Sequence, residues 1–244
     1  MVSAFAARQH LVLGHGKVAD KANEIIAIPK LPNMLAIEGA IVTIDAMGCQ
    51  RGIARTRRDN KSDYVLALKG NQGALHTDVE LLVAEQKTRD FADTRITRDT
   101  MVDGDHGRIE TRTTTGLHPV DWLQNHHDWP VLEAVVMVEG SRETNGKIEY
   151  ETPLYLTSLV MVASLMGPIM RSHWAIENSL HWVMDMVFRD DECRVRTDHT
   201  PANFTTIKHI ARNLLRTAGG KDSLCLRRKV AAWDDDFLTG IIAR

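Results

Sequence analysis

The sequence has few features that would cross-link it covalently or place it in a membrane. Its three cysteines, Cys49, Cys193 and Cys225, are far apart and follow no paired spacing. This pattern argues against a disulfide framework and a cysteine zinc site, and it fits a reducing cytoplasm. No apolar run approaches the ~20 residues of a membrane span, and the first residues lack the order of a signal peptide. We therefore expect a cytoplasmic protein without membrane contact.

The chain also lacks a strong net charge. Its 30 Lys and Arg residues nearly balance 32 Asp and Glu residues, which leaves a formal net charge of -2. Any contact with a polyanion must therefore come from local basic clusters. Such clusters lie at 51–61, 106–112, 189–196 and 226–229. Each of them could neutralise phosphates, although a single cluster is more often a solvated surface.

Strand and helix patterns alternate in the first third of the chain. Strand patterns occupy 9–18, 40–45 and 63–69, and helix patterns occupy 20–35, 52–60 and 74–87. Apolar residues at helical spacing in the last segment predict a core-facing side. Alternating strands and helices predict parallel strands joined by crossover helices.

The pattern changes after residue 90. Period-two alternation at 106–117 predicts a strand, and Asn145-Gly146 predicts a hairpin between two further strands at 132–143 and 147–159. These strands form an antiparallel insert or a sheet edge. After residue 160 we expect helices: a long one beginning at Pro168, another opened by Thr200-Pro201, and one or two in the tail.

Asp45 is the first candidate for chemistry. It ends the apolar strand IVTI, whose composition suggests burial on both faces. Ligands bind beyond the carboxyl ends of strands in open parallel sheets, so this carboxylate is a site candidate. The alternative is that its side chain only caps the following turn, AMG.

A polar stripe on the long helix is the second candidate. His173, Glu177, His181 and Asp185 recur every four residues and so lie along one side of a helix. The stripe could hold a metal, or Glu177 alone could join Asp45 in an acidic site. The simpler alternative is a half-exposed helix with hydrogen-bonded histidines. The spacing differs from the His-Glu-x-x-His motif of zinc proteases.

Seven sequence blocks occur in an order that resembles the H-repeat-associated transposases of bacterial insertion sequences. The resemblance runs from Met1 to Arg244. The blocks are VADKANEIIAIPKL (18–31), IVTIDAMGCQ (41–50), DYVLALKGNQ (63–72), HGRIETR (106–112), LYLTSL (154–159), RSHWAIENSLHWVMDMVFRDDECR (171–194) and NLLR (213–216).

The resemblance implies an α/β fold, namely an RNase H-like mixed sheet flanked by helices with an antiparallel β insertion before the glutamate-bearing helix. It divides one domain over 1–244 into a core at 8–90 and 160–218, a β-rich insertion at about 91–159 and a helical tail at 219–244. Such transposases use two aspartates and a glutamate to bind two Mg²⁺ (or Mn²⁺) ions, which activate the attacking oxygen and stabilise the leaving oxygen.

The resemblance assigns a role to individual residues. Asp45 matches the second carboxylate of the family and Glu177 the third, so both would be catalytic metal ligands. The DNA-facing residues would be Lys69 and Asn71 in the active cleft, Arg108 in the block 106–112, and Arg171 and His173 beside the glutamate.

One departure from the family pattern concerns the first carboxylate. In the family it lies on a strand upstream of the segment that matches Val2–Ala6, and no residue here takes its place. The sequence therefore predicts an N-terminally truncated transposase that lacks the first core strand and is inactive alone.

The expected partners are the DNA ends of the insertion sequence and target DNA, with a homodimer or a mixed dimer with full-length transposase. Two alternatives remain. One is a non-catalytic DNA-binding remnant that inhibits the full-length enzyme, and the other is a metallohydrolase that uses the polar stripe.

Overall fold

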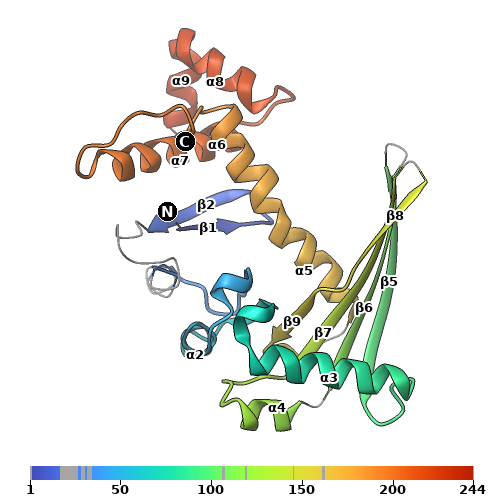
Figure 1. The fold of residues 1–244 in the computed structure, drawn as a ribbon. Coiled ribbons are helices and arrows are strands. Elements are labelled where there is room, and N and C mark those ends of the chain that lie inside the picture. Colours follow the sequence, from blue (N-terminus) through green and yellow to red (C-terminus); the bar gives the residue numbers. More distant parts are fainter. Residues whose placement is uncertain are drawn as a thin grey trace. The chain divides into compact units, whose positions relative to one another are not determined.

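A computed structural model describes residues 2–16, 27–28, 31, 35–105, 108–118, 120–144, 146–160 and 163–243. The side chains of Asp105 and Arg108 lie outside this description. The chain divides into two compact units, one of 21–173 and one of 1–20 with 174–244, and each is considered by itself (Figure 1). Most of the helix predicted at 20–35 lies outside the described residues.

The unit of 21–173, called the sheet unit below, is built on a seven-stranded sheet. Its strands run in the order β3-β4-β9-β7-β6-β5, with β8 paired to β7 beside this path. Among the described strands only β3 and β4 pair in parallel, so the sheet is mixed, as expected. The strands are β3 (Ile41–Ile44), β4 (Asp63–Leu68), β5 (Arg95–Asp105), β6 (Arg108–His118), β7 (Ala134–Thr144), β8 (Lys147–Glu151) and β9 (Leu154–Thr157).

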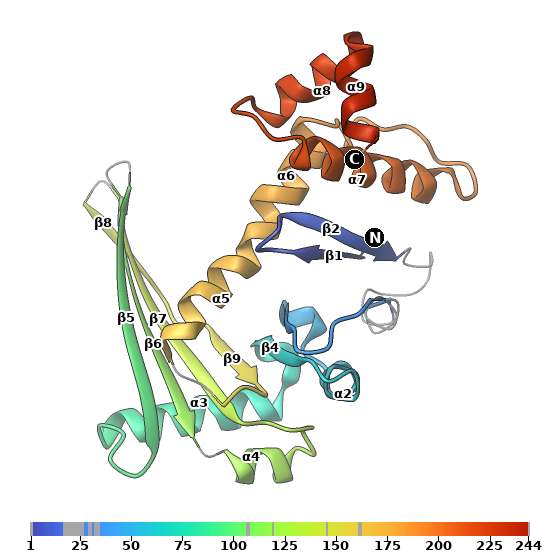
Figure 2. The same cartoon turned by 180° about the vertical axis from the view of Figure 1, so that it is seen from behind.

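Helices cover both faces of this sheet, which confirms the expected RNase H-like α/β class. Strand β4 shows why: Leu66 packs with Val79 of α3 and Leu123 of α4, whereas Val65 packs in a second cluster with Met166 of α5. Because alternate side chains of a strand point to opposite faces, α3 and α4 cover one face and α5 the other (Figure 2). The helices are α2 (Arg51–Asp59), α3 (Ala74–Thr88), α4 (Asp121–His126) and α5 (Ala163–Ile176), of which α5 ends in the other unit.

The prediction of a buried strand before Asp45 is wrong. Strand β3 is an edge strand with β4 as its neighbour among the described strands, and Ile41 is 44% exposed. The more buried strand of this parallel pair is β4, in which Tyr64, Val65, Leu66 and Leu68 are buried. The apolar residues before Asp45 therefore predicted the strand correctly but not its position at the edge of the sheet.

The β-rich middle of the chain extends the same sheet. Gly146 adopts the left-handed φ of 76° that the predicted Asn145-Gly146 hairpin needs, so that hairpin is confirmed. The single strand predicted at 147–159 is divided into β8 and β9 around Thr152-Pro153. Strand β5 and helix α4 were not predicted, because 95–105 is largely polar and α4 is short.

The long helix does not begin at Pro168. Helix α5 begins at Ala163 and contains Pro168, which has no N–H to bond the carbonyl of Ser164. It continues into a π-helical turn, η4 (Glu177–His181), and then into α6 (Trp182–Met186). The predicted helix is therefore real, but its start and its regularity were wrong.

The second unit, called the helical unit below, contains a hairpin and the C-terminal helices. Strands β1 (Val2–Ala6) and β2 (Leu11–Gly16) pair antiparallel in a sheet of their own, which corrects the prediction that 9–18 is a parallel strand. The four residues between them can form a turn but not a crossover. The predicted helices are confirmed as α7 (Thr200–Thr217), α8 (Leu224–Trp233) and α9 (Asp235–Ile242).

Side-chain hydrogen bonds fix the hairpin to α7. Asn213 Nδ2 donates to the Val12 carbonyl at 2.8 Å, and its Oδ1 accepts from the Val12 N–H at 3.0 Å. Leu180 and Met184 pack on Val12 in the small core of this unit. No helix of the described residues is long and apolar enough to span a membrane.

Arg57 of α2 is a buried cation that has no hydrogen-bond acceptor among the described residues. Its side chain is fully buried, and in the part of the chain that the structure describes no guanidinium nitrogen of Arg57 has a hydrogen-bond partner. Burial lowers the pKa of Arg57 to about 10. A buried, unpaired charge destabilises the folded state.

We predict that Arg57→Leu stabilises the protein by about 2 kcal/mol, since an apolar side chain removes the desolvation penalty. Urea unfolding should show a higher midpoint at unchanged slope. Arg58→Leu is the matched control. Because Arg58 pairs with Asp63, this variant should be less stable than the wild type. A lower midpoint for Arg57→Leu would contradict the interpretation.

His209 of α7 makes the helical unit sensitive to acid. Burial, and next the neighbouring His15, lower the pKa of His209 to about 4, while Asp190 opposes this shift. The ring centroids of His15 and His209 are 5.1 Å apart.

The unfolded chain binds a proton at His209 below about pH 6.5, whereas the folded chain does so only near pH 4. Stability should therefore be complete above pH 6.5 and fall by about 2 kcal/mol toward pH 4. Unfolding measured from pH 7.5 to 4 should show this loss, and His209→Leu should flatten the profile over that window. An unchanged profile in the variant would refute the assignment.

Candidate active site

Asp45 lies at the carboxyl end of β3, where a tight turn begins. Its backbone is extended (φ −67°, ψ 178°), and its Oδ1 accepts a hydrogen bond from the Gly48 N–H at 3.3 Å. The side chain thus caps η2 (Ala46–Gly48), as the alternative interpretation of the sequence predicted. The residue is exposed, and Oδ2 has no partner among the described residues. One oxygen therefore shapes the turn while the other faces solvent.

Gly48 allows this turn to fold back on β3. A Cβ atom at position 48 would lie 2.2 Å from Cγ2 of Ile44, a distance that no side chain can accept. Gly48 is itself buried. Close packing of the turn against β3 therefore requires a glycine three residues after Asp45.

A second turn supports the first. Since β3 and β4 are parallel neighbours, their carboxyl ends lie at the same edge of the sheet. The turn η3 (Gly70–Gln72) follows β4, and Asn71 Nδ2 donates to the Ala46 carbonyl at 2.7 Å. Lys69 precedes this turn and is exposed. Asn71, predicted to face DNA, has a positioning contact that the sequence did not reveal.

His173 lies against the same strand. Its Nδ1 is 3.0 Å from Thr43 Oγ1, and Thr43 is two residues before Asp45 on β3. Residues two apart on an extended chain point to the same side, so His173 and Asp45 belong to one face. The structure therefore brings Asp45, Asn71 and His173 to the carboxyl ends of β3 and β4.

Arg171 points elsewhere. Its Nη1 donates to Asp103 Oδ2 of β5 at 2.7 Å, whereas His173 on the same helix contacts β3. Both groups of the Arg171–Asp103 pair are about half exposed, so the pair is weak and can open. Arg108 begins β6, but its side chain is not described, and its predicted DNA contact remains a prediction.

Glu177 belongs to the helical unit and starts the π-helical turn η4. It is exposed, and its Oε2 lies 3.0 Å from His181 Nδ1. π-Helical turns inside α-helices are rare and occur often at functional sites. The sequence predicted the residue but gave no signal for this local geometry.

Arg212 of α7 holds that turn in place. Its guanidinium donates through Nε and Nη2 to the carbonyl of Ser179, which lies inside η4, and through Nη1 to the carbonyl of His10 at 2.7 Å. The side chain is only 2% exposed, and its burial lowers its pKa. These contacts tie the glutamate-bearing turn to the hairpin of the same unit.

The polar stripe does not form a three-ligand metal group. Among the described residues, only Asp78, His126 and His127 place three candidate ligand atoms within 4.8 Å of one another. Asp185, the last member of the stripe, has a pKa raised by burial and by the carboxylates of Asp191 and Asp190. The zinc interpretation of the stripe therefore gains no support.

The two predicted catalytic carboxylates have the right donor chemistry for Mg²⁺, which prefers hard oxygen ligands and retains water. Asp45 offers a solvent-facing oxygen, and Glu177 is exposed with one oxygen on His181. Both residues therefore offer the carboxylate oxygens that suit Mg²⁺. Asp45 belongs to the sheet unit and Glu177 to the helical unit.

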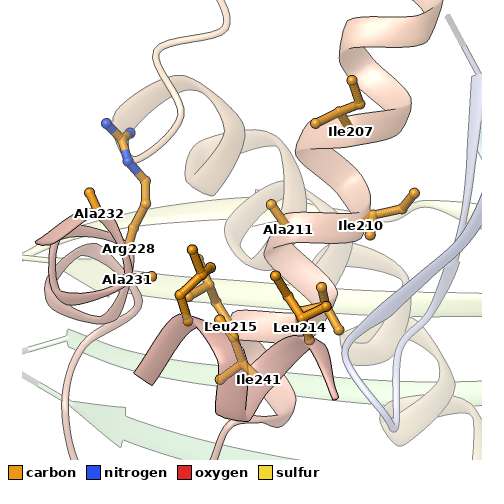
Figure 3. A pocket seen from close by; sticks show the side chains of 11 residues that line it. Ile207, Ile210, Ala211, Leu214, Leu215, Arg228, Ala231, Ala232 and Ile241 are labelled. Carbon is orange, nitrogen blue, oxygen red and sulfur yellow. The ribbon is translucent and has the colours of Figure 1, made fainter. Parts of the chain in front are cut away.

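The helical unit also has an apolar groove of about 440 Å³ (Figure 3). It is lined by aliphatic side chains from α7, α8 and α9, such as Ile207, Leu215 and Ile241, together with Arg228. Its described lining residues include no carboxylate or imidazole, and none of the predicted site residues lines it.

Comparison with known proteins shows the family to which the chain belongs. The model of the Transposase DDE domain matches residues 1–214. Two proteins of Escherichia coli (strain K12), named "Putative protein YbfL" and "H repeat-associated putative transposase YhhI", are each 34% identical over 254 residues. Each alignment covers 100% of this chain and 65% of the relative, so the chain spans about 65% of their length.

A third relative, from Escherichia coli O157:H7, is named "Putative transposase YncI". It is 35% identical over 257 residues, which cover 100% of this chain and 63% of the relative. The family expected from the seven sequence blocks is therefore confirmed. With 1–214 matched by its model, the chain belongs to the Transposase DDE domain family.

Proposed function

We propose that this chain supplies two carboxylates, Asp45 and Glu177, to the metal-dependent cleavage and joining of DNA strands during transposition of an insertion sequence. The observation that carries the proposal is the construction of the Asp45 turn. Its cap on Gly48 and the bond from Asn71 to Ala46 hold one carboxylate oxygen toward solvent at the carboxyl edge of the parallel strand pair.

In this proposal two residues bind the metal ion and two others position the turns that carry them. Asp45 and Glu177 would hold Mg²⁺ or Mn²⁺, and a bound ion supplies Lewis-acid activation of the attacking oxygen and stabilisation of the leaving oxygen. Asn71 fixes the turn that carries Asp45. Arg212 fixes the turn that begins at Glu177.

DNA binding would depend on exposed cations. Lys69 is exposed beside the Asp45 turn, and Arg171 can exchange Asp103 for a phosphate at little cost because their pair is half exposed. Such contacts release counterions, so affinity should fall steeply with salt. The proposed partners are the element's ends and target DNA, bound by a homodimer or by a mixed dimer with a longer transposase.

We assign the core to 8–90 and 160–218, the β-rich insertion to about 91–159 and the tail to 219–244. The family uses three catalytic carboxylates, and we assign two of them, Asp45 and Glu177, in this chain. We therefore expect little nicking by the chain alone, and activity where a third carboxylate is supplied by another chain.

A metal-directed cleavage experiment tests whether the two carboxylates share an ion. Fe²⁺ takes the place of Mg²⁺, and ascorbate with peroxide then generates radicals that cut the backbone near the bound ion. We expect cuts near Asp45 and near Glu177, both suppressed by excess Mg²⁺. Asp45→Asn should remove both sets of cuts, whereas Asp121→Asn, an exposed aspartate in the first turn of α4, should leave them. If Asp45→Asn still shows cuts near Glu177, the two carboxylates do not share an ion and the proposal is wrong.

Plasmid nicking provides the functional readout. The substrate is a supercoiled plasmid that carries the DNA flanking this coding sequence. Mg²⁺-dependent nicking by the chain that is lost in Glu177→Gln would show that a third ligand lies within it. Salt-sensitive DNA binding, without shared metal cuts and unaffected by either carboxylate variant, would favour the DNA-binding remnant instead.

A further inference from the structure

Two histidines and an aspartate meet where α3 and α4 approach in the sheet unit. Asp78 lies in the second turn of α3, His126 ends α4, and His127 follows it. His127 Nε2 is 2.8 Å from Asp78 Oδ2, and His126 Nε2 is 3.7 Å from the same oxygen. All three candidate ligand atoms lie within 4.8 Å of one another. None of these residues has a role in the proposed transposition chemistry.

The second histidine distinguishes this group from an ordinary helix-to-helix hydrogen bond. One imidazole, that of His127, already gives Asp78 a hydrogen bond. His126 is too far from the carboxylate to add another, and its ring stands at 85° to that of His127 with the centroids 4.8 Å apart. Both Nε2 atoms therefore converge on one carboxylate oxygen from different directions.

We propose that Asp78, His126 and His127 form a binding site for a borderline divalent cation, with Zn²⁺ as the best fit. Imidazole and carboxylate ligands suit Zn²⁺, whereas Mg²⁺ prefers an all-oxygen shell. Ligand bonds of about 2.0–2.1 Å in a tetrahedron place neighbouring ligand atoms about 3.3 Å apart. Asp78 and His127 would separate slightly from 2.8 Å, and His126 would close from 3.7 Å.

The surroundings allow the ion to enter. The side chain of His126 is 67% exposed, while those of Asp78 and His127 are 28% and 13% exposed. The two inner ligands are thus held by the fold, and the outer one can turn from solvent onto the ion. A water molecule would complete four-coordination. The nearby Arg51 donates to the His127 carbonyl at 3.1 Å rather than to its ring.

A bound ion would connect three segments of the sheet unit. It would join α3 to the end of α4 directly. Through the Arg51–His127 bond it would also reach the first residue of α2, which follows the Asp45 turn. The proposed Zn²⁺ site would therefore stabilise the contact between these helices. It differs from the proposed Mg²⁺ site because two of its three ligands are imidazoles.

The test is Zn²⁺ binding to the full chain, measured by competition with a chromophoric chelator. We expect one tightly bound Zn²⁺ per chain and at least tenfold weaker binding in His126→Ala. This variant should fold normally, because His126 is exposed and makes no hydrogen bond that the described structure requires. His76→Ala is the matched control: His76 lies on α3 near Asp78 but pairs with Glu80, so the variant should keep wild-type affinity.

Thermal unfolding provides a second measurement, since a ligand that binds only the folded state raises the melting temperature. Saturating Zn²⁺ should raise it in the wild type and in His76→Ala but not in His126→Ala. Unchanged Zn²⁺ affinity in His126→Ala would overturn the proposal. Loss of the ion in His181→Ala instead would place the zinc beside Glu177 and would overturn it as well.

Discussion

A single buried guanidinium organises the helical unit. Arg212 donates to carbonyls of the β1–β2 turn and of the π-helical turn after Glu177, so segments near residues 10 and 179 depend on one side chain of α7. A π-helical turn disturbs the regular backbone ladder, and Arg212 supplies donors to a carbonyl within it. Asn213, the next residue, binds both backbone groups of Val12. The position of the glutamate within this unit is thus set by polar contacts from another helix.

The sheet unit positions its carboxylate by the same kind of contact. An amide from one turn holds the carbonyl of another, and the aspartate closes its own turn. Arg57 shows the opposite case, a guanidinium buried without acceptors among the described residues. The two arginines are almost equally hidden from water, but Arg212 has backbone carbonyls as acceptors that offset part of the cost of its burial.

Local signals in the sequence predicted local structure well. The Asn145-Gly146 hairpin, the apolar side of α3 and the proline that opens α7 were correct because each depends on neighbouring residues. The edge position of β3, the separate β1–β2 hairpin and the early start of α5 were missed, since each is decided by tertiary partners. At the site, the cap by Asp45 followed from its turn, whereas the bond from Asn71 to Ala46 depends on how two loops meet. The adjacent histidines at 126 and 127 were visible in the sequence, but their partner Asp78 is 48 residues before the first of them.

The close approach at Gly48 also bears on how such a gene decays. Every amino acid that a single base change can substitute for glycine carries a Cβ atom, and that atom would collide with Ile44. Any amino-acid substitution at this codon therefore displaces the turn while both acidic residues stay intact. A related sequence can therefore keep both acidic residues of the proposed site while the Asp45 turn no longer folds, so the presence of the carboxylates alone is a poor guide to whether that turn is intact.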